Sequence, residues 1–140
     1  MKNLTPNFIL QKDLAKQSNG GFSAATMFID IKGFTPIAEK LLKKRKIGAE
    51  TLSVILESVF RPVIALIYSH GGFISEFAGD GINAVFPDDQ ATPSMALNCA
   101  IQIKNDIASN RIHHTEFGDF NTSLKKVDIL LFISSIKDFF

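Results

Sequence analysis

The sequence predicts an α+β domain, and three observations support that class. Residues 22–31 form an almost continuous run of small apolar and β-branched residues, which is typical of a buried strand. A segment that opens with a Thr-Pro helix cap and a segment with the apolar spacing of a helix come next, and two short strand-like segments follow around an Asp-Gly turn. A further helical segment comes after this hairpin. A hairpin combined with packed helices is the pattern of an α+β fold.

The first strand is expected at residues 22–31 (FSAATMFIDI), and its nearly continuous apolar character predicts a central strand covered on both faces. The residues before it contain Pro6 and the breaker Ser18-Asn19-Gly20-Gly21. Residues 1–21 are therefore interpreted as an N-terminal lead-in.

Two helices are expected after the first strand. One begins at Thr35 and runs to about Lys44, because Thr35 is a favourable N-cap and Pro36 a favourable first helical residue. The other covers residues 49–69, where apolar residues recur with helical spacing and predict a face directed at the core. Pro62 predicts a kink or break within this second helix.

A hairpin is expected after Gly71-Gly72, which ends the second helix. Residues 73–78 and 82–86 predict two short strands joined by Gly79-Asp80-Gly81. Asp-Gly tolerates the positive φ values that a tight hairpin turn requires.

The C-terminal third of the sequence predicts one more helix and then a weaker pattern. Thr92-Pro93 repeats the combination of cap and proline, and opens a helix that reaches Ile107. Cys99 lies on the apolar face of this helix and is interpreted as a buried, inert thiol. Residues 117–125 are consistent with the start of another strand, and residues 127–140 form an apolar run that no polar element closes.

Composition limits the class of protein. The chain has 140 residues, 46% of them apolar and 21% charged, with a net charge of +1, so it has material for at most one domain with a real core. The near-zero net charge does not indicate nucleic-acid binding. No uninterrupted apolar run is long enough to predict a membrane span. A single cysteine excludes a disulfide framework, and the polar start MKNLTPNFILQKD is unlike a secretory signal. We therefore expect a cytoplasmic protein.

Two aspartates are the candidate metal ligands. Asp30 lies at the end of the first strand, and the helix N-terminus that follows at residues 33–35 offers free N–H groups to a phosphate. If the hairpin pairs with the first strand, Asp80 comes beside Asp30, and two carboxylates with phosphate oxygens form the oxygen shell that Mg²⁺ prefers. Each aspartate taken alone is also accounted for by ordinary turn or cap chemistry.

A family resemblance rests on three segments in this order and at this spacing: FIDIKGFTPIAEKL, GAETLSVILESVF and HGGFISEFAGDGINAVFP. Together they resemble the catalytic domain of class III adenylyl/guanylyl cyclases, especially the branch of soluble adenylyl cyclase and large bacterial multidomain cyclases. The likeness covers about residues 22–109. It implies a ferredoxin-like palm with βαββαβ order, an antiparallel central sheet and flanking helices.

The resemblance also implies a site. Asp30 and Asp80 correspond to the aspartates that hold two Mg²⁺ or Mn²⁺ ions, with the Ile31 carbonyl as a further metal contact. The phosphate-binding segment corresponds to Gly33, Phe34 and Thr35. The implied reaction is the attack of the ribose 3′-hydroxyl on the α-phosphate of ATP or GTP, which releases pyrophosphate and a 3′,5′-cyclic nucleotide.

Glu76 occupies the position that reads the base in this family. Adenylyl cyclases usually carry a Lys there and guanylyl cyclases a Glu. A carboxylate accepts hydrogen bonds from the N1–H and amino group of guanine and repels the N1 acceptor of adenine. The alternative is that Glu76 is only a polar residue at a strand edge, so the choice between adenine and guanine stays open.

The last part of the chain departs from the family. Residues 110–140 contain no match to the Asn and Arg that stabilise the transition state across a dimer interface, nor to the dimerisation segment. Arg111, His113 and His114 come too early to replace them and are expected in a solvated loop. We therefore expect a C-terminally truncated or frameshifted domain, with a lead-in at 1–21, a partial cyclase domain at 22–124 and a divergent apolar tail at 125–140.

The function predicted from these features is that of a purine nucleotide cyclase whose chain alone has no, or barely detectable, activity. A family dimer is expected, although its dimerisation segment has no match. One alternative is a degenerate partner or nucleotide-binding module that completes an intact cyclase subunit, and another is a remnant that folds poorly. A diguanylate cyclase ranks below these, because Gly71-Gly72-Phe73 is not followed by the acidic pair of a GG(D/E)EF signature.

Overall fold

The structure is a computed structural model that describes residues 21–87 and 93–135, with side chains at 24–87 and 94–130. Its elements follow in this order: β1 (Gly21–Lys32), α2 (Phe34–Leu42), α3 (Arg45–Ser69), β2 (Phe73–Ala78), β3 (Gly81–Pro87), α4 (Pro93–Ser109), β4 (Ile112–Thr115), β5 (Gly118–Asn121) and β6 (Ser123–Ser135).

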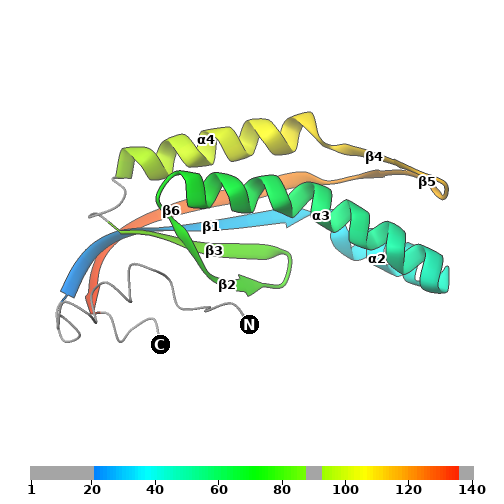
Figure 1. Cartoon of the computed structure of the whole chain (residues 1–140), viewed down its shortest axis with the longest axis horizontal. Coiled ribbons are helices and arrows are strands. Elements are labelled where there is room, and N and C mark those ends of the chain that lie inside the picture. Colours follow the sequence, from blue (N-terminus) through cyan, green and yellow to red (C-terminus); the bar gives the residue numbers. More distant parts are fainter. Residues whose placement is uncertain (1–20, 88–92, 136–140) are drawn as a thin grey trace.

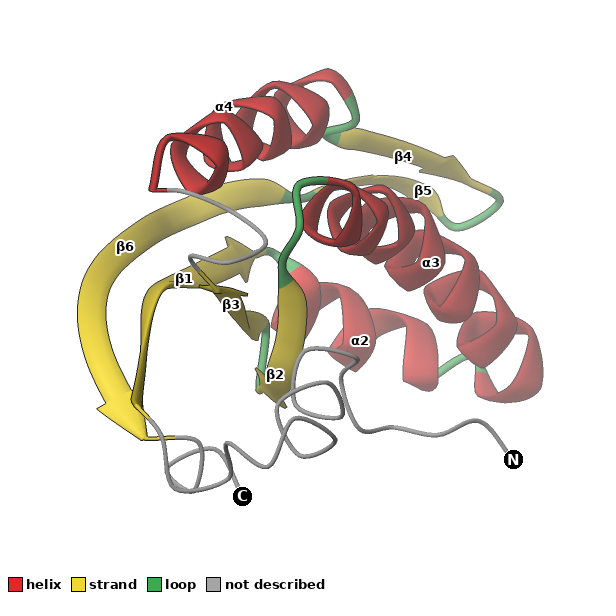
Figure 2. Ribbon diagram, turned by 60° about the vertical axis from the view of Figure 1, so that its left-hand side comes forward, coloured by secondary structure: helices red, strands yellow, loops and turns green. Residues whose placement is uncertain are grey.

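The central sheet has four strands in the order β2-β3-β1-β6, and every neighbouring pair is antiparallel. Strands β4 and β5 form a separate two-stranded hairpin that extends beyond the end of α4 (Figure 1). Helices α3 and α4 pack on the same side of the curved sheet, α3 beside β2 and α4 beside β6 (Figure 2). The predicted α+β class with an antiparallel sheet is confirmed.

Strand β1 is covered on one face along most of its length, which corrects the expectation of a strand covered on both. Met27, Ile29 and Ile31 are fully buried on the side of the helices. The alternating residues Phe28 and Asp30 keep partial exposure on the other side. This second side of the sheet, which we call the open face, carries the polar residues discussed below.

Helix α3 packs one stripe of side chains into the core. Its buried side chains recur every four residues, at Ile55, Val59, Val63 and Ile67. Pro62 lies inside this continuous helix of 25 residues and does not end it, so the predicted break does not occur.

By length and composition alone, α3 is long and apolar enough to cross a membrane, although the sequence has no uninterrupted apolar run of that length. Its buried stripe packs into the core together with side chains of β1, β3 and α4. A helix that buries one stripe against a sheet has the pattern of a core helix in a globular domain.

The first helix begins one residue earlier than predicted and uses a different cap. Gly33 is the N-cap of α2, with φ 113°, and Thr35 is already inside the helix. Gly33 lies against the backbone of Asn121, where a Cβ atom would stand 2.4 Å from the carbonyl oxygen. Phe34 is consequently buried, and its ring stacks on that of Phe60 at a centroid distance of 5.2 Å. A tertiary contact has therefore overridden the local preference of Thr35 for the cap.

The C-terminal segment differs from the predicted tail. Strand β6 pairs with β1 from the Lys32↔Ser123 pair to the Gly21↔Ser135 pair. The boundary predicted at 124/125 falls inside β6, because Val127 and Ile129 pack against the core cluster as sheet residues. Residues 1–20 and 136–140, which hold most of the predicted lead-in and the end of the predicted tail, lie outside the described residues.

Cys99 is a free, buried cysteine on α4, as the apolar spacing predicts. Burial raises the pKa of its thiol to about 11. The thiolate form is therefore scarce at neutral pH, which agrees with a packing role.

Candidate functional site

The two candidate aspartates lie together because β1 pairs with β3. Asp30 stands opposite Gly81 in this antiparallel ladder, so Asp80 is one residue from the direct partner of Asp30. The backbone N–H of Ile31 donates a hydrogen bond to the Asp80 carbonyl oxygen at 3.2 Å. The pairing on which the sequence-based site depended is therefore present.

Gly81 makes this close approach possible. A Cβ atom at position 81 would stand 2.8 Å from the ring of Phe28 and 3.1 Å from the carbonyl oxygen of Ile29. A larger residue would push β3 away from β1 at the end where the aspartates meet. The Gly-Asp-Gly turn thus fixes the separation of the two strands as well as reversing the chain.

The N-terminus of α2 faces the same region. The N–H groups of Phe34 and Thr35 have no carbonyl one turn earlier to bond, and Pro36 has no N–H. Phe34, Thr35 and Asp80 line one hollow of about 340 Å³, which α2 and α3 complete through Ala38, Glu39, Leu42, Leu52 and Leu56. The free donors of a helix and one candidate metal ligand therefore border a common space.

Glu76 lies on β2, on the open face. It pairs in register with Asn83 of β3, which in turn stands opposite Phe28 of β1. Directly opposed residues of a sheet share a face, so Glu76 and Asp30 lie on the same side, two strands apart. The Asn83 side-chain amide donates a hydrogen bond to Glu76 Oε1 at 2.8 Å, which fixes the orientation of an otherwise exposed carboxylate.

The donor set suits a hard divalent cation. Asp30 and Asp80 supply carboxylate oxygens, and Ile31, whose side chain is buried, has only its carbonyl to offer. Among residues 21–87 and 93–135 no group of three or more His, Cys, Asp or Glu side chains gathers as a metal site would. A metal at this place would therefore need oxygens of a substrate or of water to complete its shell.

Sequence reasoning missed Lys125. Its Nζ lies 3.8 Å from Asp30 Oδ2, and the Asp30 side chain keeps only 21% of its exposure. Nothing in the local sequence indicates this contact, because it depends on how β6 pairs with β1.

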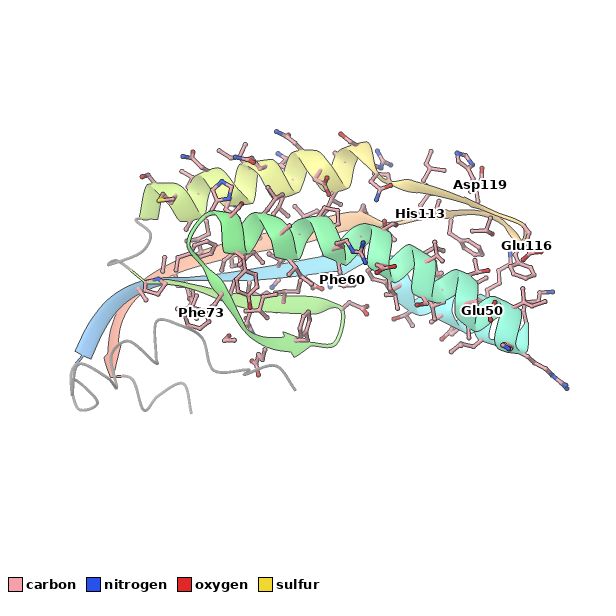
Figure 3. All side chains as sticks on the ribbon, in the orientation of Figure 1. Glu50, Phe60, Phe73, His113, Glu116 and Asp119 are labelled. Atoms are coloured by element: carbon pink, nitrogen blue, oxygen red, sulfur yellow. The ribbon has the colours of Figure 1, made fainter. Side chains whose placement is uncertain are left out.

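The three residues expected in a solvated loop, Arg111, His113 and His114, differ in their surroundings. Arg111 and His114 are exposed, but His113 of β4 (Figure 3) is 8% exposed. Its Nε2 lies 2.8 Å from Thr122 Oγ1. His113 is buried because Ile112–Thr115 pairs with β5 and packs beside α3. None of the three borders the hollow beside Asp80.

Comparison with known proteins begins with the sequence. No family model matches the chain. It is 29% identical over 106 residues to adenylate cyclase type 10 of Oryctolagus cuniculus and 28% identical to the same protein of Rattus norvegicus, in each case over 70% of this chain. The chain spans only 7% of the length of these curated relatives.

Solved structures share the fold. A bacterial light-regulated adenylyl cyclase matches with a TM-score of 0.59 at 19% identity, over 82% of this chain and 32% of its own. The guanylyl cyclase Cya2 gives 0.58 at 18% identity, over 83% and 57%. The guanylate cyclase domain of RhGC from Catenaria anguillulae, solved in complex with GTP, gives 0.54 at 22% identity, over 81% and 57%. The predicted resemblance is thus confirmed: in sequence this chain is similar to adenylate cyclase type 10, and its fold is that of class III adenylyl/guanylyl cyclase catalytic domains.

Proposed function

We propose that this chain carries the metal- and phosphate-binding part of a purine nucleotide cyclase, which converts ATP or GTP into a 3′,5′-cyclic nucleotide and pyrophosphate. The observation that carries the proposal is the β1–β3 pairing, which sets Asp30 beside Asp80 next to the free N-terminus of α2. Similarity to adenylyl and guanylyl cyclases supports the same reaction class.

Asp30, Asp80 and the Ile31 carbonyl would hold two Mg²⁺ or Mn²⁺ ions. Such ions, when bound, lower the pKa of the attacking 3′-hydroxyl and neutralise charge on the leaving phosphates. The part played by the protein is to hold the carboxylates at adjacent strand ends, where the Ile31–Asp80 hydrogen bond limits their relative movement.

The triphosphate would lie across the N-terminus of α2. The N–H groups of Phe34 and Thr35 would donate to phosphate oxygens, and the positive end of the helix dipole favours an anion there. Gly33 has no side chain to obstruct this approach, and the buried Phe34 ring anchors the turn against Phe60.

The base would lie toward β2, where Glu76 is held by Asn83. A carboxylate in this place accepts hydrogen bonds from the N1–H and amino group of guanine, whereas adenine offers an acceptor at N1. This chemistry favours GTP, although the sequence relatives are named adenylate cyclases.

Low turnover is expected from the chain alone. A transition-state arginine of the kind found in this reaction class contributes several kcal/mol through its charge. None of the residues that line the hollow beside Asp80 is an arginine. We therefore propose that a second subunit, either another copy or an intact cyclase chain, completes the site.

Nucleotide binding tests the metal and phosphate site directly. The full chain is titrated with a fluorescent GTP or ATP analogue in the presence and absence of Mn²⁺. Asp30→Asn and Asp80→Asn should each reduce metal-dependent binding by about tenfold or more. Asp119→Asn, an exposed change on the β4–β5 hairpin, is the matched control. Equal binding by all four proteins would contradict the proposal.

Complementation tests the reaction itself. The chain is mixed with an intact cyclase subunit whose own metal aspartates have been replaced. If cyclic-nucleotide synthesis is restored and depends on Asp30 and Asp80, this chain supplies the metal ligands of the mixed assembly. Binding of nucleotide without restored synthesis would favour a non-catalytic binding module instead.

A further inference from the structure

Strand β6 carries an irregularity beside Asp30. Asp30 pairs with Lys126, but the next residue of β1, Ile31, pairs with Leu124. One residue of β6, Lys125, is therefore left without a partner across the strand pair. This is the geometry of a β-bulge, in which two residues of one strand oppose one of the other.

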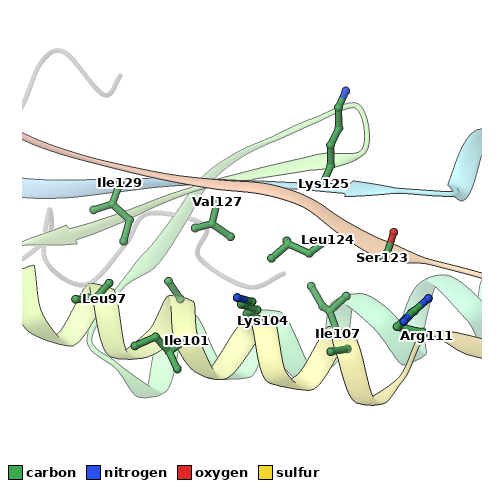
Figure 4. A pocket seen from close by; sticks show the side chains of 12 residues that line it. Leu97, Ile101, Lys104, Ile107, Arg111, Ser123, Leu124, Lys125, Val127 and Ile129 are labelled. Carbon is green, nitrogen blue, oxygen red and sulfur yellow. The ribbon is translucent and has the colours of Figure 1, made fainter.

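The bulge changes which residues of β6 face α4. Leu124 and Val127 both line the groove between β6 and α4, although residues three apart in a regular strand point to opposite faces. Lys125, between them, also borders this groove, but its side chain extends away from α4 (Figure 4). Its Nζ thereby reaches the open face and lies 3.8 Å from Asp30 Oδ2.

The neighbouring Lys126 is engaged elsewhere. Its Nζ lies 3.5 Å from Asp128 Oδ2 and 5.6 Å from the centroid of the Phe28 ring. Two adjacent lysines with similar exposure thus have different partners, and the bulge residue is the one paired with the candidate metal ligand. They form a matched pair for experiment.

We propose that the ammonium group of Lys125 competes with a divalent metal ion for the carboxylate of Asp30. This inference rests on the proposed function, because it takes Asp30 to be a metal ligand. A metal ion binds a carboxylate oxygen at a distance of about 2.0–2.1 Å, so an ammonium group near that oxygen lies within a few ångströms of the ion. Like charges at such distances repel even in high dielectric.

The competition sets the metal affinity of the free protein. The Lys125 side chain is 63% exposed, so it is able to move into solvent when a metal ion arrives, and the expected penalty is modest. We expect wild-type protein to bind Mn²⁺ about fivefold more weakly than a variant that lacks this charge.

The test measures Mn²⁺ binding to the full chain without nucleotide, from the electron paramagnetic resonance signal of the free ion. Lys125→Met should tighten binding about fivefold, and Lys125→Arg, which keeps the charge, should remain within twofold of wild type. Lys126→Met removes an equal charge one residue away and should also stay within twofold. Thermal unfolding of each variant establishes that it is folded at the temperature of the measurement.

Asp30→Asn separates failure of this inference from failure of the proposed function. If Mn²⁺ binding requires Asp30 but Lys125→Met and Lys126→Met bind Mn²⁺ with the same affinity, the proposed competition by Lys125 is wrong, and the proposal that Asp30 is a metal ligand stands. If Asp30→Asn binds Mn²⁺ as wild type does, Asp30 is not a metal ligand, and both the proposed metal site and the proposed competition by Lys125 are wrong. Tighter binding in Lys125→Met alone, lost when Asp30→Asn is added, is the result expected.

Discussion

Ile31 donates its backbone N–H to the carbonyl oxygen of Asp80 at 3.2 Å, across the junction of β1 and the β2–β3 turn. The bond couples the end of the central strand to the turn that carries the second candidate ligand. Because one backbone bond spans both, the relative position of Asp30 and Asp80 depends on strand geometry rather than on side-chain flexibility. Rigid placement of this kind suits a site that has to hold two cations close together.

Replacement of Gly33 by alanine should destabilise the protein strongly. Gly33 has a φ of 113°, and its Cβ would stand 2.4 Å from the Asn121 carbonyl oxygen. Gly118 is the matched control, since its φ of 106° imposes a similar strain but no atom lies within 4 Å of its Cβ position. We expect losses in the free energy of unfolding of about 3 kcal/mol for Gly33→Ala and about 1 kcal/mol for Gly118→Ala, measured by urea denaturation. Equal losses would show that the contact with Asn121 is unimportant.

Glu76→Gln should change nucleotide preference more than overall affinity. Loss of the negative charge removes a charge-assisted acceptor for guanine, so affinity for a fluorescent GTP analogue should fall about tenfold. Affinity for the ATP analogue should stay the same or rise. Glu57→Gln on the exposed side of α3, where Glu57 pairs with Arg61, should leave both unchanged. A similar loss for both analogues in Glu76→Gln would argue against base reading by this residue.

Acid should destabilise the protein through His113. Burial, and secondarily the charge of His114, lower the pKa of His113 below its ordinary 6.5. The unfolded chain therefore binds a proton more readily than the folded protein, so this contribution to stability is complete above about pH 6.5 and declines as the pH falls below it. His113→Gln should flatten the dependence of the free energy of unfolding on pH between 5 and 8. An unchanged slope would assign the acid sensitivity to other groups.

Cys99 should resist thiol reagents in the native protein. Its side chain is fully buried on α4, and its pKa is raised to about 11. Reaction with Ellman's reagent at pH 8 should therefore be at least about a hundredfold slower than that of glutathione, and should become rapid in denaturant. Fast reaction of the folded protein would place Cys99 at an accessible surface.

The sequence was sufficient to predict the elements around the two aspartates. The Asp-Gly turn between two short apolar segments predicted the hairpin. Its pairing with β1 was a condition of the predicted site that the sequence alone did not establish, and the structure shows it. The elements themselves depend on residues close together in the chain or on repeated apolar spacing, so the local sequence is enough to predict them.

Features set by contacts distant in sequence were not predictable in this way. The N-cap moved from Thr35 to Gly33 because of a contact with Asn121. Residues 125–140 are predicted as a separate tail, but residues 125–135 belong to β6, and no local signal indicates that they pair with β1. The contact of Lys125 with Asp30 depends on the pairing of β6 with β1 and on the irregularity in that pairing, and apolar periodicity reveals neither.

The pairing of Gly21 with Ser135 joins opposite ends of the described chain, so β6 is the last strand of the central sheet to be synthesised. Chains leave the ribosome N-terminus first, and contacts between distant residues form slowly because closing a long loop costs entropy. Strands β1 and β3 are thus able to pair, and Asp30 and Asp80 to meet, before Lys125 is available for pairing. If the strands form in this order, the nascent chain passes through a stage in which Asp30 lies beside Asp80 but is not yet in contact with Lys125.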